Sequence, residues 1–470
     1  MGVARRKPVS ADDLGSVDSL RRKESVMTVE LIAHLESADE PLLVRRTGVL
    51  VWGDEERHAA GYVRDPCGYA LLALAPGVQV WQRARILLQL LSVSWASMDP
   101  QPRATLNRVV RVLVLGLPAT HVAAVLLALR HRRANHKHVT RAALRLLTEH
   151  PQAEELMGTH RRVLLAVVEH ALGKATARGA ARALIEGGVA EQGPGPDLHR
   201  RLLRFAPDGA VAMARIRALY QGAASPHQGQ ASPAVAVPEL LDLDLGAARP
   251  GTVTATNRGD VAATLVHLYR GGQAADLESA LDGYVDAAAA RVASYPGTLA
   301  LVLDRSASMR GYGDREWALY SQAVALRMVL QRRCTRLVEV PVGGDGDRPG
   351  GATDLAAGVL DAVAHGPDLV AVVGDGYENV YPGDLARVVA TLPRVGITTP
   401  VVFCHSTFGH SDDLALRRPA PGLPQRAFWH EEDFAPLMLW LLAHSRSTNA
   451  KGALKDALMQ RLAAVERRLA

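Results

Sequence analysis

Aromatic residues are scarce in this chain of 470 residues, in which Phe, Trp and Tyr together make up 4% of the sequence. Its three cysteines, Cys67, Cys334 and Cys404, are an odd number without metal-type spacing, which predicts reduced thiols in a cytoplasmic protein. No apolar run is long enough to cross a membrane, and the polar N-terminal residues contain no apolar signal-peptide core. These absences argue against a disulfide-stapled secreted domain and against a membrane protein.

Motifs for catalysis are also missing. No Walker A sequence is present, which argues against nucleotide binding by a P-loop. The pairs His405-Ser406 and His410-Ser411 lack the Gly-x-Ser-x-Gly surroundings of a hydrolase nucleophile, and we expect them in solvent-facing polar loops. The sequence therefore predicts a protein that is not an enzyme.

Periodic apolar residues predict successive helices between residues 66 and 220. Short Gly and Pro interruptions separate the segments, so neighbouring helices are expected to be antiparallel. We therefore predict an all-α helical-repeat (HEAT-like) array over residues 28–221, after a flexible tail over residues 1–27. The expected helices are Ala84–Val93, Leu106–Leu115, His121–Arg130, Val139–His150, His160–Leu172 and Ala210–Tyr220, with a short β-like piece at residues 48–52.

The chain changes character after this array. Gly, Ala, Ser, Pro and Gln dominate residues 222–258, which predicts a linker or an insertion. Helical periodicity resumes over residues 259–295, and these helices are expected to close the array, with support of the following domain as the alternative. The C-terminal segment, residues 446–470, is expected to form a basic amphipathic helix.

Strand-like and helical segments alternate over residues 296–445. Expected strands are Thr298–Leu303, Leu337–Val342, Leu369–Val373 and Pro400–Cys404, and expected helices are Trp317–Arg332, Asp354–His365, Pro382–Leu392 and Asp433–Leu442. This alternation predicts a doubly wound, Rossmann-like α/β domain with a parallel sheet. Ligands of such sheets bind at the carboxyl ends of the strands.

Oxygen-bearing side chains follow the expected strands at those ends. The loop Asp304-x-Ser306-x-Ser308 offers one carboxylate and two hydroxyls, Thr353 follows a Gly-rich turn, and Asp375 follows another apolar strand. Hard oxygen ligands of this kind suit Mg²⁺ or Mn²⁺. The sequence therefore predicts a divalent metal site, with Mg²⁺ as the expected ion.

The order of these three loops resembles a von Willebrand factor A domain with its metal-ion-dependent adhesion site (MIDAS). The resemblance covers residues 296–445 and implies Asp304, Ser306, Ser308, Thr353 and Asp375 as the metal site. Gly374 stands where relatives usually have Thr, which should alter packing more than ligation. The resemblance also implies an open metal position that an acidic side chain of a partner protein fills.

A basic segment lies inside the helical part of the chain. Residues 130–141 carry five permanent positive charges and three histidines, with no acid until Glu149, within a net charge of +6 for the whole chain. On the expected helix, Lys137, Arg141 and Arg145 are spaced by four and form one stripe. Such a fixed array of donors suits phosphate, and Asn135 and the histidines are expected to add contacts to sugars or bases.

The expected domain combination resembles the TROVE (Ro-type) RNA-binding proteins, in which a helical ring precedes an A-like domain. His136-Lys137 at the start of a helix is similar to a pair on that family's RNA-binding surface. The resemblance implies binding of small structured RNA, with His136 and Lys137 as ligands. Charge geometry adds the arginines Arg130, Arg132, Arg133 and Arg141 to this predicted RNA site.

A protein-interaction function is the alternative. An A-like domain with a helical array could be a metal-dependent adaptor for an AAA+ ATPase or a conflict-system complex. RNA binding would depend on Lys137 and Arg141 and fall with salt. An adaptor would instead lose its partner when Asp304 is replaced or the metal is chelated. The sequence leaves the oligomeric state and the identity of any partner open.

Overall fold

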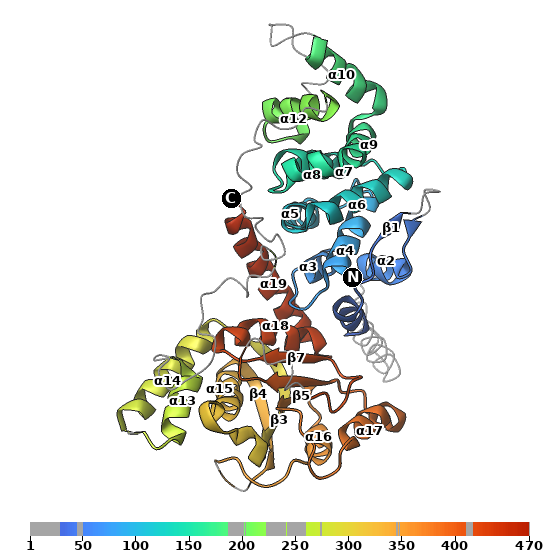
Figure 1. The fold of residues 1–470 in the computed structure, drawn as a ribbon. Coiled ribbons are helices and arrows are strands. Elements are labelled where there is room, and N and C mark those ends of the chain that lie inside the picture. Colours follow the sequence, from blue (N-terminus) through green and yellow to red (C-terminus); the bar gives the residue numbers. More distant parts are fainter. Residues whose placement is uncertain are drawn as a thin grey trace, which may run out of the picture. The chain divides into compact units, whose positions relative to one another are not determined.

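The computed structural model describes residues 29–44, 50–186, 202, 204–221, 241, 260–272, 275–344, 346, 348–409 and 417–469 (Figure 1). The chain divides into two compact units. One contains Ala247–Ala457 with the residues up to Ala33 and is called the α/β unit here; the other contains His34–Gly246 and Leu458–Ala470 and is called the helical unit. The expected tail over residues 1–27 lies outside the described residues, as does the expected linker over residues 222–258 apart from Leu241.

The helical unit consists of short helices joined by tight connections (Figure 1). A two-stranded antiparallel sheet, β1 (Leu43–Val44) and β2 (Leu50–Val51), precedes them. The helices are α2 (Glu55–Arg64), α3 (Pro66–Leu72), α4 (Val80–Ser92), α5 (Pro100–Gly116), α6 (Ala119–His131), α7 (Lys137–Thr148), α8 (Ala153–Thr159), α9 (Arg161–Leu172), α10 (Lys174–Glu186) and α12 (Gly209–Gln221). Most of these helices pack on others that are close in the chain, such as α4 on α6 and α5 on α7, and α6 also packs on α9. The predicted succession of locally packed helices is therefore confirmed.

A helix could be predicted from the sequence where it buries an apolar face. The inner face of α7 carries Val139, Ala142, Ala143 and Leu146, all of them buried, at the three- and four-residue spacing of one helix face. The helix α2 was not predicted because it buries only His58 and Tyr62 and is otherwise rich in charge. Too few apolar residues there repeat at helical intervals to produce a signal.

The α/β unit contains a five-stranded, fully parallel sheet in the order β4-β3-β5-β6-β7. Its strands are β3 (Tyr295–Arg305), β4 (Cys334–Gly343), β5 (Leu369–Gly374), β6 (Val401–Ser406) and β7 (Gln425–Phe428). The chain steps from β3 to β4 on one side and then returns to β5 on the other. This reversal of direction is a topological switch point, and the carboxyl ends of β3 and β5 flank it.

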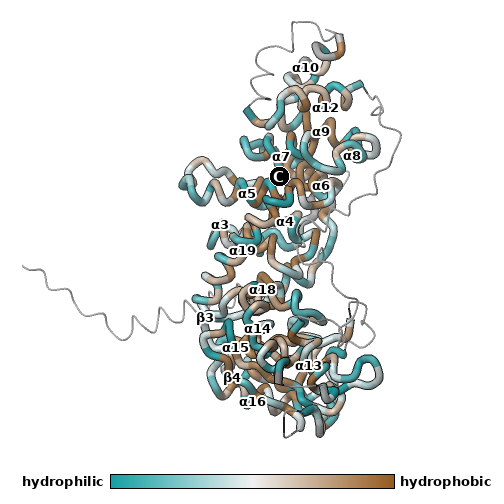
Figure 2. Tube along the Cα trace, turned by 90° about the vertical axis from the view of Figure 1, so that its left-hand side faces the viewer, coloured by the Kyte–Doolittle hydropathy of each residue, from teal (hydrophilic) through white to brown (hydrophobic). Residues whose placement is uncertain are grey.

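Helices cover both faces of this sheet (Figure 1). Between the strands run α15 (Ala318–Arg333), α16 (Leu355–Ala364) and α17 (Asp384–Thr391), and α18 (Phe434–His444) follows β7. The face under α16 and α17 is an apolar core that includes Val302, Val372 and Phe403. The helix α18 is hydrophobic along its length (Figure 2) and buries every residue from Leu437 to His444. Because helices cover both faces of the sheet, its inner strands are apolar throughout, and every residue of β5 and β6 is buried.

The expectation that residues 259–295 close the helical array is wrong. Their helices, α13 (Val261–Tyr269) and α14 (Ala275–Ala290), pack against α15 and belong to the α/β unit. The Tyr269 ring lies 5.3 Å from the ring of Trp317 between centroids. Helical periodicity shows that a face is buried but does not identify the element that buries it, so the alternative interpretation holds.

The C-terminal helix α19 (Thr448–Arg468) forms as predicted. Its last turns belong to the helical unit, where Arg108 Nε donates to Glu466 at 3.0 Å and Arg461 donates to the carbonyl of Leu241. Leu241 is itself buried, so this one described residue of the expected linker is part of the packed helical unit. Among the described residues, no helix has the length and apolar character needed to cross a membrane.

Candidate functional site

The predicted metal loops meet at the carboxyl ends of β3 and β5. Asp304 lies near the end of β3 and is 0% exposed. Its Oδ1 accepts a hydrogen bond of 2.8 Å from the backbone N–H of Ser306, while the hydroxyls of Ser306 and Ser308 are 3.0 Å apart. The first loop therefore brings the carboxylate and both hydroxyls together, as the motif predicted.

The Gly-rich turn before Thr353 is fastened to this loop by backbone hydrogen bonds. Gly350 N–H donates to Arg305 O at 2.8 Å, and Ala307 N–H donates to Gly351 O at 3.2 Å. Thr353 is 0% exposed, and its carbonyl accepts from Val380 N–H in the loop after β5. All three loops thus contact one another at the switch point of the sheet.

Two buried oxygens in this cluster have no hydrogen-bond partner among the described residues: Asp304 Oδ2 and Thr353 Oγ1. Burial, and after it the nearby charge of Asp375, raises the pKa of Asp304 to about 7. Native proteins seldom leave buried oxygens unpaired, and a neighbouring carboxylate makes the deficit of positive charge worse. The donor set of carboxylates and hydroxyls at this point fits a hard divalent cation.

Gly374 lies beside this cluster, one residue beyond the last paired residues of β3 and β5. A Cβ atom at position 374 would lie 2.8 Å from Asp304 Cβ and 2.9 Å from Asp304 Oδ2. Both distances are shorter than ordinary van der Waals contact. The absence of a side chain at position 374 therefore lets β5 approach the carboxylate of Asp304 closely.

The pair His405-Ser406 is not solvent-facing, contrary to expectation. Both residues belong to β6 and are buried, with exposures of 3% and 2%. His405 Nε2 lies 2.7 Å from Gln425 Oε1, and the Ser406 hydroxyl donates to Leu319 O at 2.8 Å. The strand β7, which supplies Gln425, was not predicted, and this missing neighbour is the reason for the error. His410-Ser411 lies outside the described residues.

The predicted RNA-binding residues lie at the connection between α6 and α7. Arg130, Arg133 and Lys137 are exposed, whereas Arg132, His136 and Arg141 are half-buried. Arg133 adopts a left-handed backbone conformation with φ of 56°. The Arg141 guanidinium lies 5.9 Å from the centroid of the Phe205 ring.

Two of the polar side chains in this segment make contacts within the protein. Asn135 Nδ2 donates to His170 O at 2.8 Å, and His170 Nε2 lies 2.7 Å from Ala134 O, so the connection is fastened to the end of α9. His138 is buried and stacks on Trp95 with a centroid distance of 3.9 Å. Burial lowers the pKa of His138 to about 4, so its ring is neutral at pH 7. The expectation that all three histidines contact RNA is therefore wrong for His138, whereas Asn135 is exposed and its contact with RNA stays a prediction.

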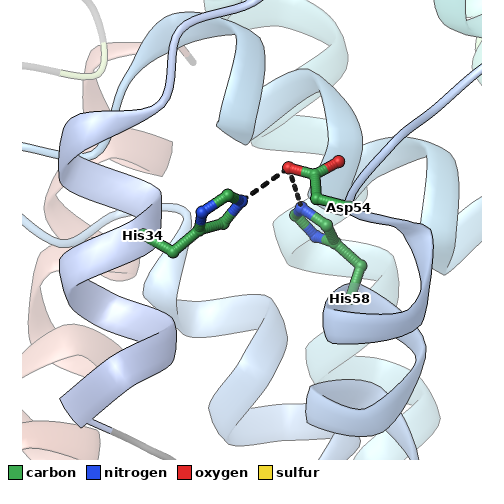
Figure 3. Close-up of side chains that lie close together, drawn as sticks. All are labelled: His34, Asp54 and His58. Atoms are coloured by element: carbon green, nitrogen blue, oxygen red, sulfur yellow. Dashed lines mark hydrogen bonds and ion pairs between the residues drawn. The ribbon is translucent and has the colours of Figure 1, made fainter.

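A cluster that sequence analysis missed surrounds Asp54, just before α2 (Figure 3). His34 Nε2 and His58 Nε2 approach the same oxygen, Asp54 Oδ2, at 2.7 and 3.5 Å. Gln82 Nε2 donates to this oxygen at 3.0 Å, and Arg85 Nε lies 3.0 Å from Asp54 Oδ1. His34 and Asp54 are 20 positions apart without a motif between them, so only the fold brings them together.

The three residues His34, Asp54 and His58 could hold a metal ion by their spacing. The second ring nitrogens of both histidines, however, already have partners within the protein. Arg57 Nη1 lies 2.9 Å from His34 Nδ1, which makes Nδ1 the acceptor and leaves Nε2–H to donate to Asp54. Metal-bound histidines usually donate their second N–H to an acceptor instead. This geometry favours Asp54 as a half-buried anchor that accepts several hydrogen bonds.

The lowered pKa of Asp54 agrees with its role as a hydrogen-bond acceptor. Burial alone would raise the pKa of Asp54, but hydrogen bonds with His58, Gln82 and His34 outweigh this effect and hold its pKa well below the ordinary range. Tyr69 Oη lies 2.6 Å from His58 Nδ1, and Gln82 Oε1 lies 2.9 Å from His58 Nε2. Each ring nitrogen of His58 therefore has a partner within the protein.

Comparisons with known proteins give little. No family model matches the chain, and no curated protein matches it. The crystal structure of the Deinococcus radiodurans Ro (RSR) protein is similar with a TM-score of 0.35 and 11% sequence identity, over 88% of this chain and 100% of that one.

Proposed function

We propose that this protein is a non-catalytic RNA-binding scaffold that contacts RNA phosphates through the surface around Arg130, Arg133 and Lys137. The observation that carries the proposal is the combination of exposure and fixed backbone at these cations. All three are exposed at one helix–helix connection, and none of them pairs with an acid among the described residues. His136, Arg132 and Arg141 border them.

Binding a phosphate orders long side chains, which costs conformational entropy. A backbone that is already fixed adds no further entropy cost. The connection between α6 and α7 is tied to α9 through Asn135 and His170, so its cations start from a defined position. Each phosphate contact releases condensed counterions, which makes affinity fall steeply with salt. Small structured RNA is the expected cargo, because such a surface reads shape and backbone more than sequence.

The test is RNA binding at low and moderate salt with two charge variants. A labelled hairpin RNA with a single-stranded tail should bind the unaltered protein and bind Lys137→Gln about tenfold more weakly, the loss of one charge-assisted contact. Arg394→Gln removes an exposed cation from the α/β unit and should leave affinity unchanged. RNA sequencing of the purified protein and its 260/280 absorbance ratio would identify natural cargo. A nucleic-acid-free preparation that fails to bind the hairpin at low salt would refute the proposal.

A metal-dependent adaptor is the second candidate, favoured by the two unpaired buried oxygens of Asp304 and Thr353. Asp304, Ser306, Ser308, Thr353 and Asp375 would hold the ion, most simply Mg²⁺, and would leave a position for an acidic side chain of a partner. Exposed aromatic rings occur in loops that follow the ligand strands, with Tyr312 85% and Tyr381 61% exposed. Such rings are common anchors of protein partners.

Thermal unfolding in Mg²⁺ or Mn²⁺ after treatment with EDTA tests this site. Metal should raise the melting temperature of the unaltered protein but not of Asp304→Asn, because ligands that bind only the folded state stabilise it. Asp361→Asn removes an exposed carboxylate of α16 and is the matched control. Equal responses of both variants to metal would exclude the site.

A further inference from the structure

Among the described residues, Arg132 is the one predicted RNA ligand with an anionic partner. Its Nη2 lies 2.6 Å from Glu55 Oε2, and its guanidinium lies 4.8 Å from the centroid of the Trp52 ring. Glu55 and Trp52 belong to a segment about eighty positions earlier in the chain, residues 52–55, at the start of α2. This segment therefore neutralises one charge of the basic surface while leaving Arg130, Arg133 and Lys137 free of described acids.

The hydrogen-bond network around the half-buried Asp54 holds this segment in place. Asp54 lies between Trp52 and Glu55, the two residues that contact Arg132. It accepts hydrogen bonds from His34 and Gln82 and forms an ion pair with Arg85. The Trp52 ring is only 7% exposed and lies 5.6 Å from the ring of His58. Residues of the segment cannot shift without disturbing these buried contacts, so the Glu55 carboxylate is presented to Arg132 from a rigid base.

We propose that the Glu55 carboxylate occupies, on Arg132, the position that an RNA phosphate takes when RNA binds. The inference rests on the proposed RNA-binding function and adds that Glu55 competes with RNA for Arg132. Carboxylate and phosphate oxygens both match the planar donor fork of a guanidinium. Binding then exchanges one ion pair within the protein for one with RNA.

The exposure of the pair allows this exchange. The Glu55 side chain is 45% exposed and that of Arg132 is 26% exposed, so solvent reaches both charges. Ion pairs of this kind contribute little to stability, and a phosphate that arrives with neighbouring contacts to Arg133 and Lys137 can replace the carboxylate. The Trp52 ring keeps the guanidinium in position during the exchange, because its face attracts the cation whichever anion is bound.

Glu55→Gln tests the inference against a closely matched control. The adjacent Glu56 is exposed, carries the same charge and has no described partner on the basic surface, so Glu56→Gln removes equal charge without freeing Arg132. We expect Glu55→Gln to bind the labelled hairpin RNA about threefold to tenfold more tightly than Glu56→Gln. The salt dependence should steepen by roughly one phosphate contact, because no carboxylate takes up a cation when RNA binds.

The double variant Glu55→Gln/Arg132→Gln completes a thermodynamic cycle. If Glu55 acts through Arg132, the gain from Glu55→Gln disappears when Arg132 is already replaced. Equal affinities and salt slopes for Glu55→Gln and Glu56→Gln would overturn the inference, as would a full gain in the double variant. Failure of the unaltered protein to bind RNA would overturn the proposed function and this inference together. Weaker binding by Lys137→Gln with no effect of Glu55→Gln would refute the inference alone.

Discussion

Two histidines near the start of α7, His136 and His138, differ in burial and therefore in their surroundings. His136 is half-buried at the position before the helix, whereas His138 is 6% exposed and packs face to face on Trp95. Sequence shows only that both lie in a basic run. The partner ring of His138 comes from residue 95, so its neutral state follows from tertiary packing and not from the local pattern.

Replacing His138 should change how stability depends on pH. Burial lowers its folded pKa to about 4 from 6.5, so between these values the unfolded chain binds a proton that the folded chain does not. Stability from the neutral ring is therefore complete above pH 6.5 and is lost as pH falls toward 4. We expect the unaltered protein to lose about 2 kcal/mol from this group between pH 7 and pH 5. His138→Phe should lack this part of the loss.

Urea titrations at the two pH values measure this difference. His365→Gln, which replaces an exposed histidine of the α/β unit, is the control and should follow the unaltered protein. If His138→Phe lost as much stability on acidification as the control, the buried histidine would not be the source of the pH dependence.

At the candidate metal site, the meeting of the loops could be predicted because the expected ligands follow strands. Asp304 and Asp375 each come just after an apolar run, and the rule that parallel strands share a carboxyl edge brings them together. The consequence of Gly374 for Asp304 Oδ2 could not be predicted, because it depends on the register between β3 and β5. No such rule applies to the Asp54 cluster, because its members come from the helical residues 29–37, the residue before α2, α2 itself and α4.

Helices and strands were predicted where apolar residues recur at helical spacing over several turns or form a continuous run. The long helices of the helical unit and the strands β3 to β6 have this property, and their cores give a strong periodic signal. The strand β7 has four residues with only Phe428 buried, so it gives no such signal. For α13 and α14 the periodicity was sufficient to predict helices but not to assign them to a unit.

The connection between α6 and α7 stores backbone strain at Arg133. A side chain with φ of 56° is less favourable than glycine in the left-handed region. Arg133→Gly should therefore raise the free energy of unfolding by up to about 1 kcal/mol, while RNA binding weakens because an exposed cation is lost. Chemical denaturation and hairpin binding measure the two effects.

Arg133→Lys separates charge from strain in this experiment. Lysine keeps both the charge and the Cβ atom, so stability should be unchanged and most of the affinity should remain. A loss of stability in Arg133→Gly would mean that the arginine side chain makes contacts that outweigh the strain, and would contradict the expectation.

For the whole molecule, the two proposed sites belong to different units of the chain, which makes their functions separable. Lys137 lies in the helical unit and Asp304 in the α/β unit. We expect Lys137→Gln to weaken hairpin binding and leave the Mg²⁺-dependent rise in melting temperature intact. Asp304→Asn should do the reverse, because its neutral side chain removes a metal ligand without changing the basic surface.

RNA binding must be measured in monovalent salt with EDTA, so that Mg²⁺ does not change the RNA itself. Under these conditions a scaffold that recognises RNA through the α6–α7 connection keeps its affinity in Asp304→Asn. If Asp304→Asn lost RNA binding while Lys137→Gln kept it, the cargo would bind at the strand ends of the sheet. The basic surface would then be a solvated face that balances acids elsewhere, and the metal-dependent adaptor would be the better account of the chain.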